Sequence, residues 1–488
     1  MSYTEQLNQF KNYGNQIIQK IKDYNSAISK EQSTEGNKIP DDLSRCIENM
    51  EKAAEKVVEQ ASSSVKIGVM GEFSSGKTTL LGSLLGYAGA LPESENASTG
   101  NVTYLRIEQE TDLKETEFQF QVEYLDRTEV EDCLNFMLKT AKENSLIKEL
   151  SEEQLTALEN FDPKNTGVWQ QVLDWCKNTS NQIENLGLRN QIKEIEVFAQ
   201  SYIWHGEKVC RSKPINVDID TVPFGLQLSS RQIDENVFNQ IPTNEEDLKK
   251  FLQATFYLIR RINVEVKVSQ VIWDLSSIQK ANKLVLLDFP GLGNADSGVR
   301  DKFLCSREME NVQTILILIE GRRAGGSRSL EIFDMLQQQR QNQVLDDFIV
   351  AGVGRFDEMD LGEEITNESL TQPIDLSQLE VLETAIKTAR SYTKEKDQRI
   401  VLLSGFMSLE TTMRRFSQVK VGSDKILPKL NNLDFQRKSE QLRAKCKQLS
   451  EQLNESDPTV ANLLKEVAND GGINYLRILL EKHINNHG

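Results

Sequence analysis

The chain has 488 residues and a formal net charge of −17, with 38% hydrophobic and 27% charged residues. This length exceeds one ordinary domain, and the composition is typical of a globular chain rather than a disordered one. The acidic balance disfavours nonspecific nucleic-acid binding, which needs clustered lysine and arginine, so no nucleic-acid partner is expected. No apolar run approaches the roughly 18 residues of a membrane span. The first residues lack a signal-peptide pattern, which predicts a cytoplasmic protein.

Cysteine and histidine are too scattered for a zinc site, a disulfide framework or a histidine-based triad. The six cysteines stand singly without C-x-x-C spacing, and two of the three histidines lie at the C-terminus. The cysteines are therefore expected to be reduced thiols.

Apolar residues recur every three or four positions near both ends of the chain, which predicts amphipathic helices. One stripe spans residues 5–30, a second spans 43–57, and a third spans 435–453 and ends before Pro458. Two interpretations are open. These helices either lie singly on the surface of a large domain or pack together as one helical bundle formed by both chain ends.

Short apolar or alternating runs between these helices predict strands. They lie at 64–70, 101–109, 117–125, 262–273, 283–289, 314–320, 348–354 and 399–405. Continuous runs such as 283–289 indicate strands buried on both faces, whereas the alternation in 117–125 indicates a one-sided or edge strand. Helical patterns alternate with these runs, so the fold class is α/β. Residues 127–258 instead resemble consecutive helices, a helical insertion whose tryptophans are expected in its core.

The stretch GEFSSGKT, Gly71 to Thr78, matches the P-loop pattern G-x-x-x-x-G-K-[ST] and lies between a predicted strand and a predicted helix. In this setting, backbone N–H groups and the helix N-terminus point at phosphates. Lys77 is expected to reach the β- and γ-phosphates, and the Thr78 hydroxyl to bind Mg²⁺. The expected nucleotide-binding residues here are Gly71, Glu72, Phe73, Ser74, Ser75, Gly76, Lys77, Thr78 and Thr79.

The second phosphate-sensing element is predicted in LVLLDFPGLG, where Asp288 ends an apolar strand. Its carboxylate is placed to hold Mg²⁺ directly or through water. Gly291 lets the backbone N–H approach the γ-phosphate without a Cβ in the way. A D-x-x-G after a buried strand and downstream of a P-loop indicates a nucleotide-sensing switch.

With these two motifs the chain resembles the dynamin superfamily of large GTPases, particularly its bacterial dynamin-like members. The resemblance implies a P-loop GTPase domain with a mostly parallel central sheet, a helical insertion, and a helical bundle formed by N- and C-terminal segments. Three divisions follow from it. Residues 1–62 would be N-terminal bundle helices, 63–410 the GTPase domain with its insertion at about 127–258, and 411–488 the C-terminal helices that complete the bundle.

The resemblance also implies further nucleotide contacts. Thr99, or its neighbour Ser98, would coordinate Mg²⁺ from a mobile loop; alternatively, this loop only caps the next strand. In VGRFDEMD, Asp357 would accept hydrogen bonds from guanine, and Arg355 would lie over the base. Gly354 departs from the family's Thr or Asn, which weakens the expected guanine affinity.

Ser404 and Gly405, after the last predicted strand, would supply a backbone contact to the guanine O6. For catalysis, the resemblance implies Ser74, Lys77 and Thr99. Phe73 stands where vertebrate dynamins carry a Gln, so Ser74 would help to hold a charge-compensating monovalent cation, K⁺ or Na⁺.

The implied function is GTP hydrolysis to GDP and phosphate, stimulated by dimerisation of GTPase domains and coupled to bundle movement in membrane remodelling. The loop with Arg322, Arg323 and Arg328 either contributes charge to a partner molecule or is a solvated basic loop. The basic stretch 411–450 either meets anionic lipid or is a solvated helix face.

The implied partners are GTP and GDP, a nucleotide-dependent homodimer, and a partner dynamin-like protein or an anionic membrane at the inner face. Two other functions stay open. One is a GTP-gated regulatory or interaction protein without membrane activity, and the other is an ATPase or nonhydrolysing scaffold.

Overall fold

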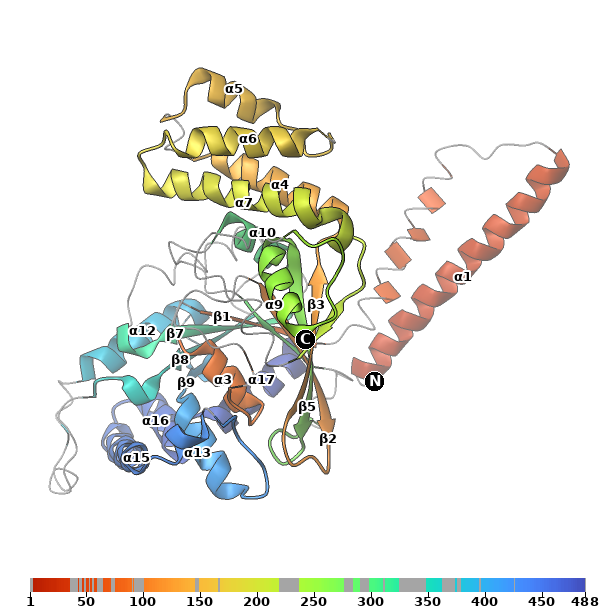
Figure 1. Ribbon diagram of the computed structural model, residues 1–488. Coiled ribbons are helices and arrows are strands. Elements are labelled where there is room, and N and C mark those ends of the chain that lie inside the picture. The colour runs from red at the N-terminus through yellow and green to blue at the C-terminus, as the bar shows by residue number, and fades with distance from the viewer. Residues whose placement is uncertain are drawn as a thin grey trace.

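The apolar runs of the sequence form one large sheet at the centre of the protein, seen in the computed structural model of the chain (Figure 1). The structure describes residues 3–35, 43, 46–47, 50–51, 53–54, 57–58, 65–71, 75–89, 91, 101–144, 149–165, 167–218, 237–275, 284–289, 298–309, 312–323, 348–361, 374, 379–394, 396–424 and 426–487. In this part of the chain the sheet has nine strands in the order β4-β3-β5-β2-β6-β1-β7-β8-β9. Their bounds are β1 Val65–Gly71, β2 Val102–Glu110, β3 Glu117–Tyr124, β4 Ile215–Val217, β5 Ile259–Ser269, β6 Leu284–Asp288, β7 Thr314–Glu320, β8 Ile349–Gly354 and β9 Ile400–Leu402.

One half of the sheet, from β6 to β9, is entirely parallel. The register places Val69 of β1 beside Asp288 of β6, and Gly71 beside Leu318 of β7. The carboxyl ends of these strands therefore share one edge, where open α/β sheets bind their ligands. The P-loop and the segments after β6, β8 and β9 all start from this edge.

The other half of the sheet is mixed, since β2 is antiparallel to β6 and parallel to β5, while β3 is antiparallel to both β5 and β4. All eight predicted strands are present. β3 buries Phe120 and Val122 on one face, which confirms the one-sided strand. β4 was not predicted, because a strand of three residues is too short to show a period.

Helices cover both faces of the parallel half, which is why its strands are apolar throughout. α3 contacts β1, α16 contacts β9 and α17 contacts β7, whereas α12 packs over β7, β8 and β9 from the other side (Figure 1). The helix bounds are α1 Tyr3–Glu35, α3 Lys77–Leu84, α4 Arg127–Lys142, α5 Glu152–Asn160, α6 Val168–Ser180, α7 Leu186–Val209, α9 Glu245–Ala254, α10 Val299–Met309, α12 Glu380–Thr393, α13 Gly405–Arg415, α14 Leu427–Leu430, α15 Leu433–Leu453, α16 Pro458–Asp470 and α17 Ile473–His487. Short 3₁₀ turns are η2 Phe256–Leu258, η4 Gly321–Arg323, η6 Phe356–Glu358 and η9 Asp397–Arg399.

The insertion between β3 and β5 contains α4, α5, α6, α7 and α9, as the sequence predicts, together with β4 and η2. Its helices pack on one another and share one continuous apolar core with the sheet. Trp169 and Trp175 are buried in this core, and Trp169 packs on Tyr202 with ring centroids 4.0 Å apart. The predicted core role is confirmed for these two tryptophans, whereas Trp204, the third tryptophan of the insertion, is only half-buried.

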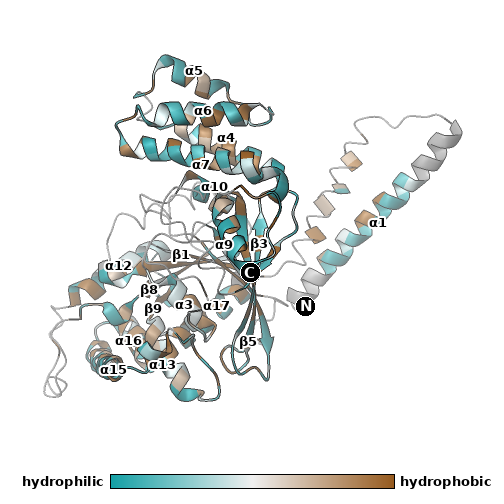
Figure 2. Cartoon of the chain, viewed as in Figure 1, coloured by the Kyte–Doolittle hydropathy of each residue, from teal (hydrophilic) through white to brown (hydrophobic). Residues whose placement is uncertain are grey.

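At the N-terminus, α1 extends away from the sheet (Figure 1). It packs closely on the following helical residues at Gly14, where an added Cβ would lie 2.5 Å from the Val58 side chain. Phe10, Ile17 and Tyr24 of its predicted apolar stripe are exposed. In Figure 2 the coloured part of α1 is mostly hydrophilic, in contrast to the hydrophobic central strands of the sheet.

α15, the third predicted helix of the bundle, packs against α16 rather than against α1 in the described part of the chain. A bundle that unites both chain ends therefore stays a prediction.

The C-terminal helices are attached to the sheet through a Gly471–Gly472 corner, where both glycines have positive φ. An added Cβ on Gly472 would lie 2.0 Å from the carbonyl oxygen of Leu402 in β9, so this approach requires glycine. The division expected at residue 410 stays a prediction. This position lies inside α13, which begins at the Ser404 cap and continues to Arg415.

Candidate nucleotide site

The P-loop joins β1, which ends at Gly71, to α3, which begins at Lys77. Gly76, the residue before α3, has φ 86° and ψ 20°, the left-handed region that glycine adopts without strain. In the part of the chain that the structure describes, no side chain caps the N-terminus of α3. Its first N–H groups are therefore available to an anion, as a phosphate-binding helix requires.

Lys77 is buried, and its Nζ donates to the carbonyl oxygen of Gly71 at 3.3 Å. Burial lowers its pKa, while the nearby Asp288 carboxylate acts in the opposite direction. Burial raises the pKa of Asp288 to about 6, opposed by the charge of Lys77. The structure thus brings the predicted lysine, the first residue of α3, close to the predicted carboxylate at the end of β6.

The residues present fit a magnesium ion bound with phosphate. The Asp288 Oδ1 and the Ser75 Oγ are buried and have no hydrogen-bond partner among the described residues, which is costly unless another group supplies one. Carboxylate and hydroxyl oxygens are the ligands that Mg²⁺ prefers. Asp288 and Thr78, in the first turn of α3, are the described residues that would hold it.

Gly354, at the end of β8, packs against the P-loop through its backbone. An added Cβ at this position would lie 2.4 Å from the carbonyl oxygen of Ser75. The next residue, Arg355, has φ 51°, and its Cγ lies 3.3 Å from an ideal Cβ built on Gly76. The Arg355 stem therefore lies over the P-loop glycine, and its expected position over a base stays a prediction.

Asp357 is held in place by Ser404, whose hydroxyl donates to Oδ1 over 2.6 Å. Burial raises the pKa of Asp357, and the hydrogen bond from Ser404 opposes this. The serine oxygen also accepts from the backbone N–H of Met407, so it caps α13 as well. A fixed carboxylate at this edge of the sheet is the group that guanine recognition needs.

The expected backbone contact from Ser404 to the base stays a prediction. In this conformation the Ser404 N–H donates to the carbonyl oxygen of Gly471 over 2.9 Å. The carbonyl oxygen of Gly405 accepts from the Ser83 hydroxyl at 2.8 Å, which attaches α13 to α3. A base contact from the Gly405 N–H stays a prediction.

Arg322 pairs within its own chain, with Glu320 and with Glu358 at 2.9 Å. Glu358 also pairs with Arg355 at 3.2 Å, so it links the loop after β7 to the residue that lies over the P-loop. Sequence reasoning did not single out Glu358. Its position three residues after Arg355 was the available signal.

Several expected site residues lie outside the described part of the chain: Glu72, Phe73, Ser74, Thr99 and Gly291, and with them Ser98 and Arg328. Their roles stay predictions. In the basic stretch 411–450, Arg443 donates to the carbonyl oxygens of Ala468 and Asn469, and Lys445 is buried. These two cations therefore serve internal packing.

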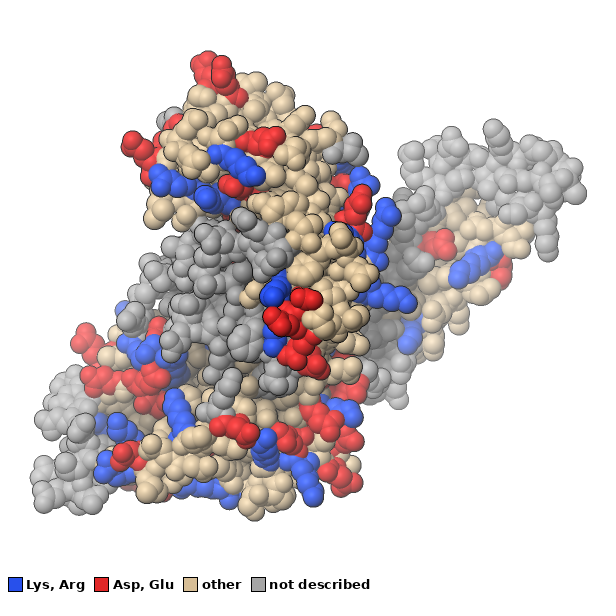
Figure 3. All heavy atoms as spheres, in the orientation of Figure 1, with Lys and Arg blue, Asp and Glu red and all other residues tan. Residues whose placement is uncertain are grey.

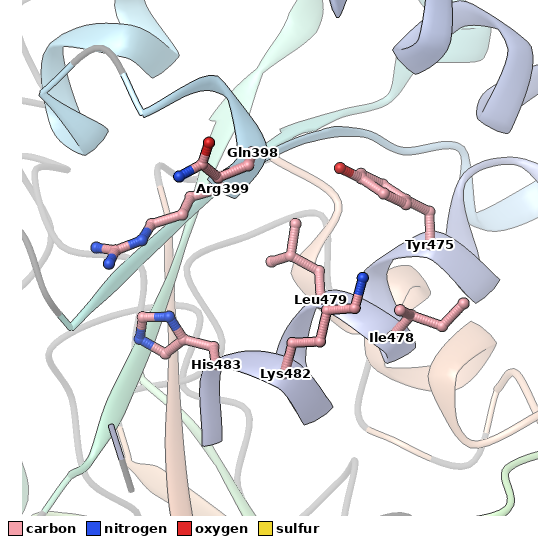
Figure 4. A pocket seen from close by; sticks show the side chains of 7 residues that line it. All are labelled: Gln398, Arg399, Tyr475, Ile478, Leu479, Lys482 and His483. Carbon is pink, nitrogen blue, oxygen red and sulfur yellow. The ribbon is translucent and has the colours of Figure 1, made fainter. Parts of the chain in front are cut away.

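A cavity of about 310 Å³ lies at the opposite, amino end of β9 (Figure 4). It is lined by Gln398, Arg399, Tyr475, Ile478, Leu479, Lys482 and His483, none of which belongs to the predicted nucleotide site. On the face seen in Figure 3, acidic and basic side chains of the described residues are interspersed. Among the helices of the described residues, none is both long and apolar enough to cross a membrane.

The parallel sheet edge, the P-loop and the two carboxylates define a P-loop nucleotide-binding α/β protein. Residues 67–345 match the Dynamin family, which is more than half of the chain, and the chain belongs to this family. Dynamin-type domains are GTPase domains in general. No curated protein matches the chain.

Two solved chains described as an oligomerised bacterial dynamin pair, with a mechanism for long-range sensing and tethering of membranes, match at 12% identity with TM-scores of 0.34 and 0.33. The matches cover 93% and 96% of this chain but only 58% and 59% of those chains. This chain therefore spans less than two thirds of their length. Likenesses of this size support no inference about assembly or function.

Proposed function

We propose that this protein is a GTPase whose hydrolysis reaction is completed by a second molecule. The observation that carries the proposal is the meeting of Lys77, Asp288 and Asp357 at the carboxyl edge of the parallel sheet. Lys77 and the N-terminus of α3 would hold the phosphates. Asp357, fixed by Ser404, would accept from the guanine N1–H and amino group, a pattern that adenine does not offer.

Bound Mg²⁺ would neutralise charge on the β- and γ-phosphates. The chain's own part is then positioning and electrostatic stabilisation, since phosphoryl transfer needs little covalent chemistry from the protein. In place of a side chain at position 354, the backbone contact between Gly354 and Ser75 keeps the base-reading loop against the P-loop. Ser74 and Thr99 are proposed to complete the site, with a monovalent cation held by Ser74.

Hydrolysis of GTP and of ATP, measured side by side with Mg²⁺, tests this proposal. GTP should be strongly preferred, and equal use of ATP would exclude the guanine assignment in favour of an ATPase. Replacing K⁺ and Na⁺ by choline should slow turnover if a monovalent cation takes part.

The Lys77→Ala variant should bind GTP at least about 100-fold more weakly. The substitution removes the ammonium group of Lys77 and with it a charge-assisted contact to the phosphates. Fluorescent GTP titration measures this loss, and circular dichroism checks that the fold is kept. Binding equal to that of the wild type would refute the P-loop role of this lysine.

We extend the proposal to membranes through the family alone, as movement of the helical segments during the GTPase cycle. Sedimentation with anionic and neutral liposomes, with GTP or GDP, tests this extension. Nucleotide-dependent pelleting on anionic liposomes supports membrane work. No pelleting in either state would leave the GTP-gated interaction protein as the better function.

A further inference from the structure

Helix α10 is the first described element after the D-x-x-G segment, since residues 290–297, which contain Gly291, join Phe289 to Gly298. A helix leaves its first four N–H groups without partners in the helix itself, and a side chain at the N-cap usually accepts from one of them. Here the residue before α10 is Gly298, which has no side chain. The acceptor must come from elsewhere in the protein.

It comes from Glu194, in the middle of α7 in the helical insertion. Glu194 Oε2 accepts from the N–H of Val299 at 2.8 Å, and Oε1 accepts from the N–H of Arg300 at 3.1 Å. Asp301, in the first turn of α10, accepts from the N–H of Gly298 at 3.4 Å. Two carboxylates thus satisfy three neighbouring donors, and the stronger of these contacts are made by the insertion.

The glycine at position 298 is explained by the same contact. An added Cβ would lie 1.9 Å from Glu194 Oε1, so any side chain at 298 would displace the carboxylate. Glu194 is 4% exposed, which makes its contacts with the N–H groups of α10 strong ones in a region of little water.

Further contacts join α10 to the insertion along its whole length. The buried Arg300 guanidinium donates to the carbonyl oxygen of Tyr257, at the end of the insertion, over 2.8 Å. At the other end of α10, Arg307 pairs with Glu129 of α4 at 3.0 Å. Between these contacts, the rings of Phe303 and Phe136 have centroids 5.7 Å apart.

We propose that Glu194 is a positioning residue that couples the helical insertion to the nucleotide state of the GTPase site. This inference rests on the proposed function, because it requires that the segment carrying Gly291 responds to the γ-phosphate. If that segment moves when the nucleotide changes, it would displace the first turn of α10, which follows it in the chain, or this turn would oppose the movement. Since Glu194 holds this turn, α7 must follow the displacement, and the position of α7 must in turn bias nucleotide binding.

Glu194→Gln tests the coupling, because the amide offers one acceptor oxygen for two N–H donors and carries no charge. Gly298→Ala is the second variant, since it displaces the carboxylate while leaving Glu194 in place. Glu207→Gln is the matched control, an exposed glutamate on the same helix. Dissociation constants for GTPγS and GDP, and amide hydrogen exchange across 186–209 and 299–309, are the measurements.

In the wild type, GTPγS should slow exchange in both α10 and α7 relative to GDP. Both test variants should lose the α7 response and reduce the preference for GTPγS over GDP by about fivefold or more, the lower end of allosteric coupling. The double variant should be no worse than either single variant, because both remove the same contact. Glu207→Gln should behave as the wild type.

An α7 response that persists in both test variants would overturn the inference. A wild type in which α10 responds and α7 does not would overturn it as well. If the wild type binds neither nucleotide, the proposed function itself fails. These results separate failure of the coupling from failure of the GTPase site.

Discussion

Gly354 shows how one residue connects the two halves of the nucleotide site. Dynamin-like sequences carry Thr or Asn there, whose side chain would brace the loop, and its loss suggested weak guanine affinity. In this protein the loop instead touches the P-loop directly, with the Ser75 carbonyl oxygen 2.4 Å from where a Cβ would lie. The side-chain brace is thus replaced by contact between two backbones.

Gly354→Ala should therefore weaken the site. The methyl group must push Ser75 and the P-loop aside, which costs about 1–3 kcal/mol in a well-packed region. The expected result is a roughly 5- to 150-fold rise in the dissociation constant for GTP, measured by fluorescent nucleotide titration.

Gly167→Ala is the control for this prediction, because that glycine precedes α6 with no heavy atom closer than 4.0 Å to an added Cβ. It should bind GTP as the wild type does. Tighter GTP binding by Gly354→Ala would contradict the steric explanation and favour the missing-brace interpretation.

At the scale of single elements, the two helices that flank the nucleotide site are both anchored by side chains remote in sequence. Glu194 of α7 accepts from the first N–H groups of α10. At the C-terminus of α3, Arg477 of α17 donates to the carbonyl oxygens of Ser83 at 3.2 Å and Leu84 at 2.8 Å. A cation at a helix C-terminus also offsets the helix dipole. The phosphate-binding helix is therefore fixed by the last helix described.

Arg477→Met should destabilise the protein by about 1–3 kcal/mol, because two buried carbonyl groups lose a charged donor. Burial lowers the pKa of Arg477 to about 10, which means that burying its charge costs free energy. The variant avoids this cost, which offsets part of the destabilisation. Denaturant titration measures the change. Arg437→Met is the control, since Arg437 pairs only with Asp434 at the surface among the described contacts and should change stability by less than about 0.5 kcal/mol.

Equal stability of the Arg477→Met and Arg437→Met variants would mean that the capping contact does not stabilise α3. In that case the attachment of α17 to the sheet would depend on its apolar side chains alone.

Asp301, in the first turn of α10, should also make the free energy of unfolding depend on pH. Burial and the nearby Glu194 raise the pKa of Asp301 to about 7, although Arg300 opposes this shift. The Asp301 carboxyl group then holds its proton more tightly in the folded protein than in the unfolded chain. The contribution of this group to stability is therefore present at low pH and is lost as pH rises from about 4 to about 7.

Asp301→Asn cannot titrate, so the advantage of the wild type over this variant should shrink as pH rises. Melting temperatures of both proteins at pH 5.5 and pH 8 measure it. An advantage that is constant or grows with pH would contradict the raised pKa of Asp301.

At the scale of the whole molecule, the sheet, the insertion and the C-terminal helices share one apolar core, while α1 extends outward with Phe10, Ile17 and Tyr24 exposed. Nucleotide-dependent change in the core can therefore be transmitted through packed elements. α1 contacts the helical residues that follow it, and a larger bundle would need it to meet α15.

Turnover per molecule should rise with protein concentration, because the proposed site is completed by a second copy. GTP hydrolysis measured over a wide concentration range, with sedimentation velocity under GTPγS and GDP, checks this. A monomer with constant turnover at every concentration would exclude activation by dimerisation. Lys77→Ala should stay monomeric under GTPγS if the dimer depends on bound nucleotide.

Local sequence patterns were enough to predict eight of the nine described strands, the P-loop and the order of the site motifs. Continuous apolar runs mark strands covered on both faces, and the spacing of Gly71, Gly76 and Lys77 is set locally by what a phosphate loop requires. Asp288 and Asp357 could be placed because each follows such a strand. Parallel pairing then brings them to one edge.

The partners of these elements, by contrast, depend on how the chain packs in three dimensions. Glu194 caps α10 from more than 100 residues away, the Ser404 hydroxyl fixes Asp357, and Arg477 caps α3. No local period encodes such contacts, since they arise when helices remote in sequence pack on one sheet. The need for glycine at position 354 likewise became clear only from the structure. It comes from the P-loop backbone at Ser75, which leaves no space for a side chain and is remote in sequence.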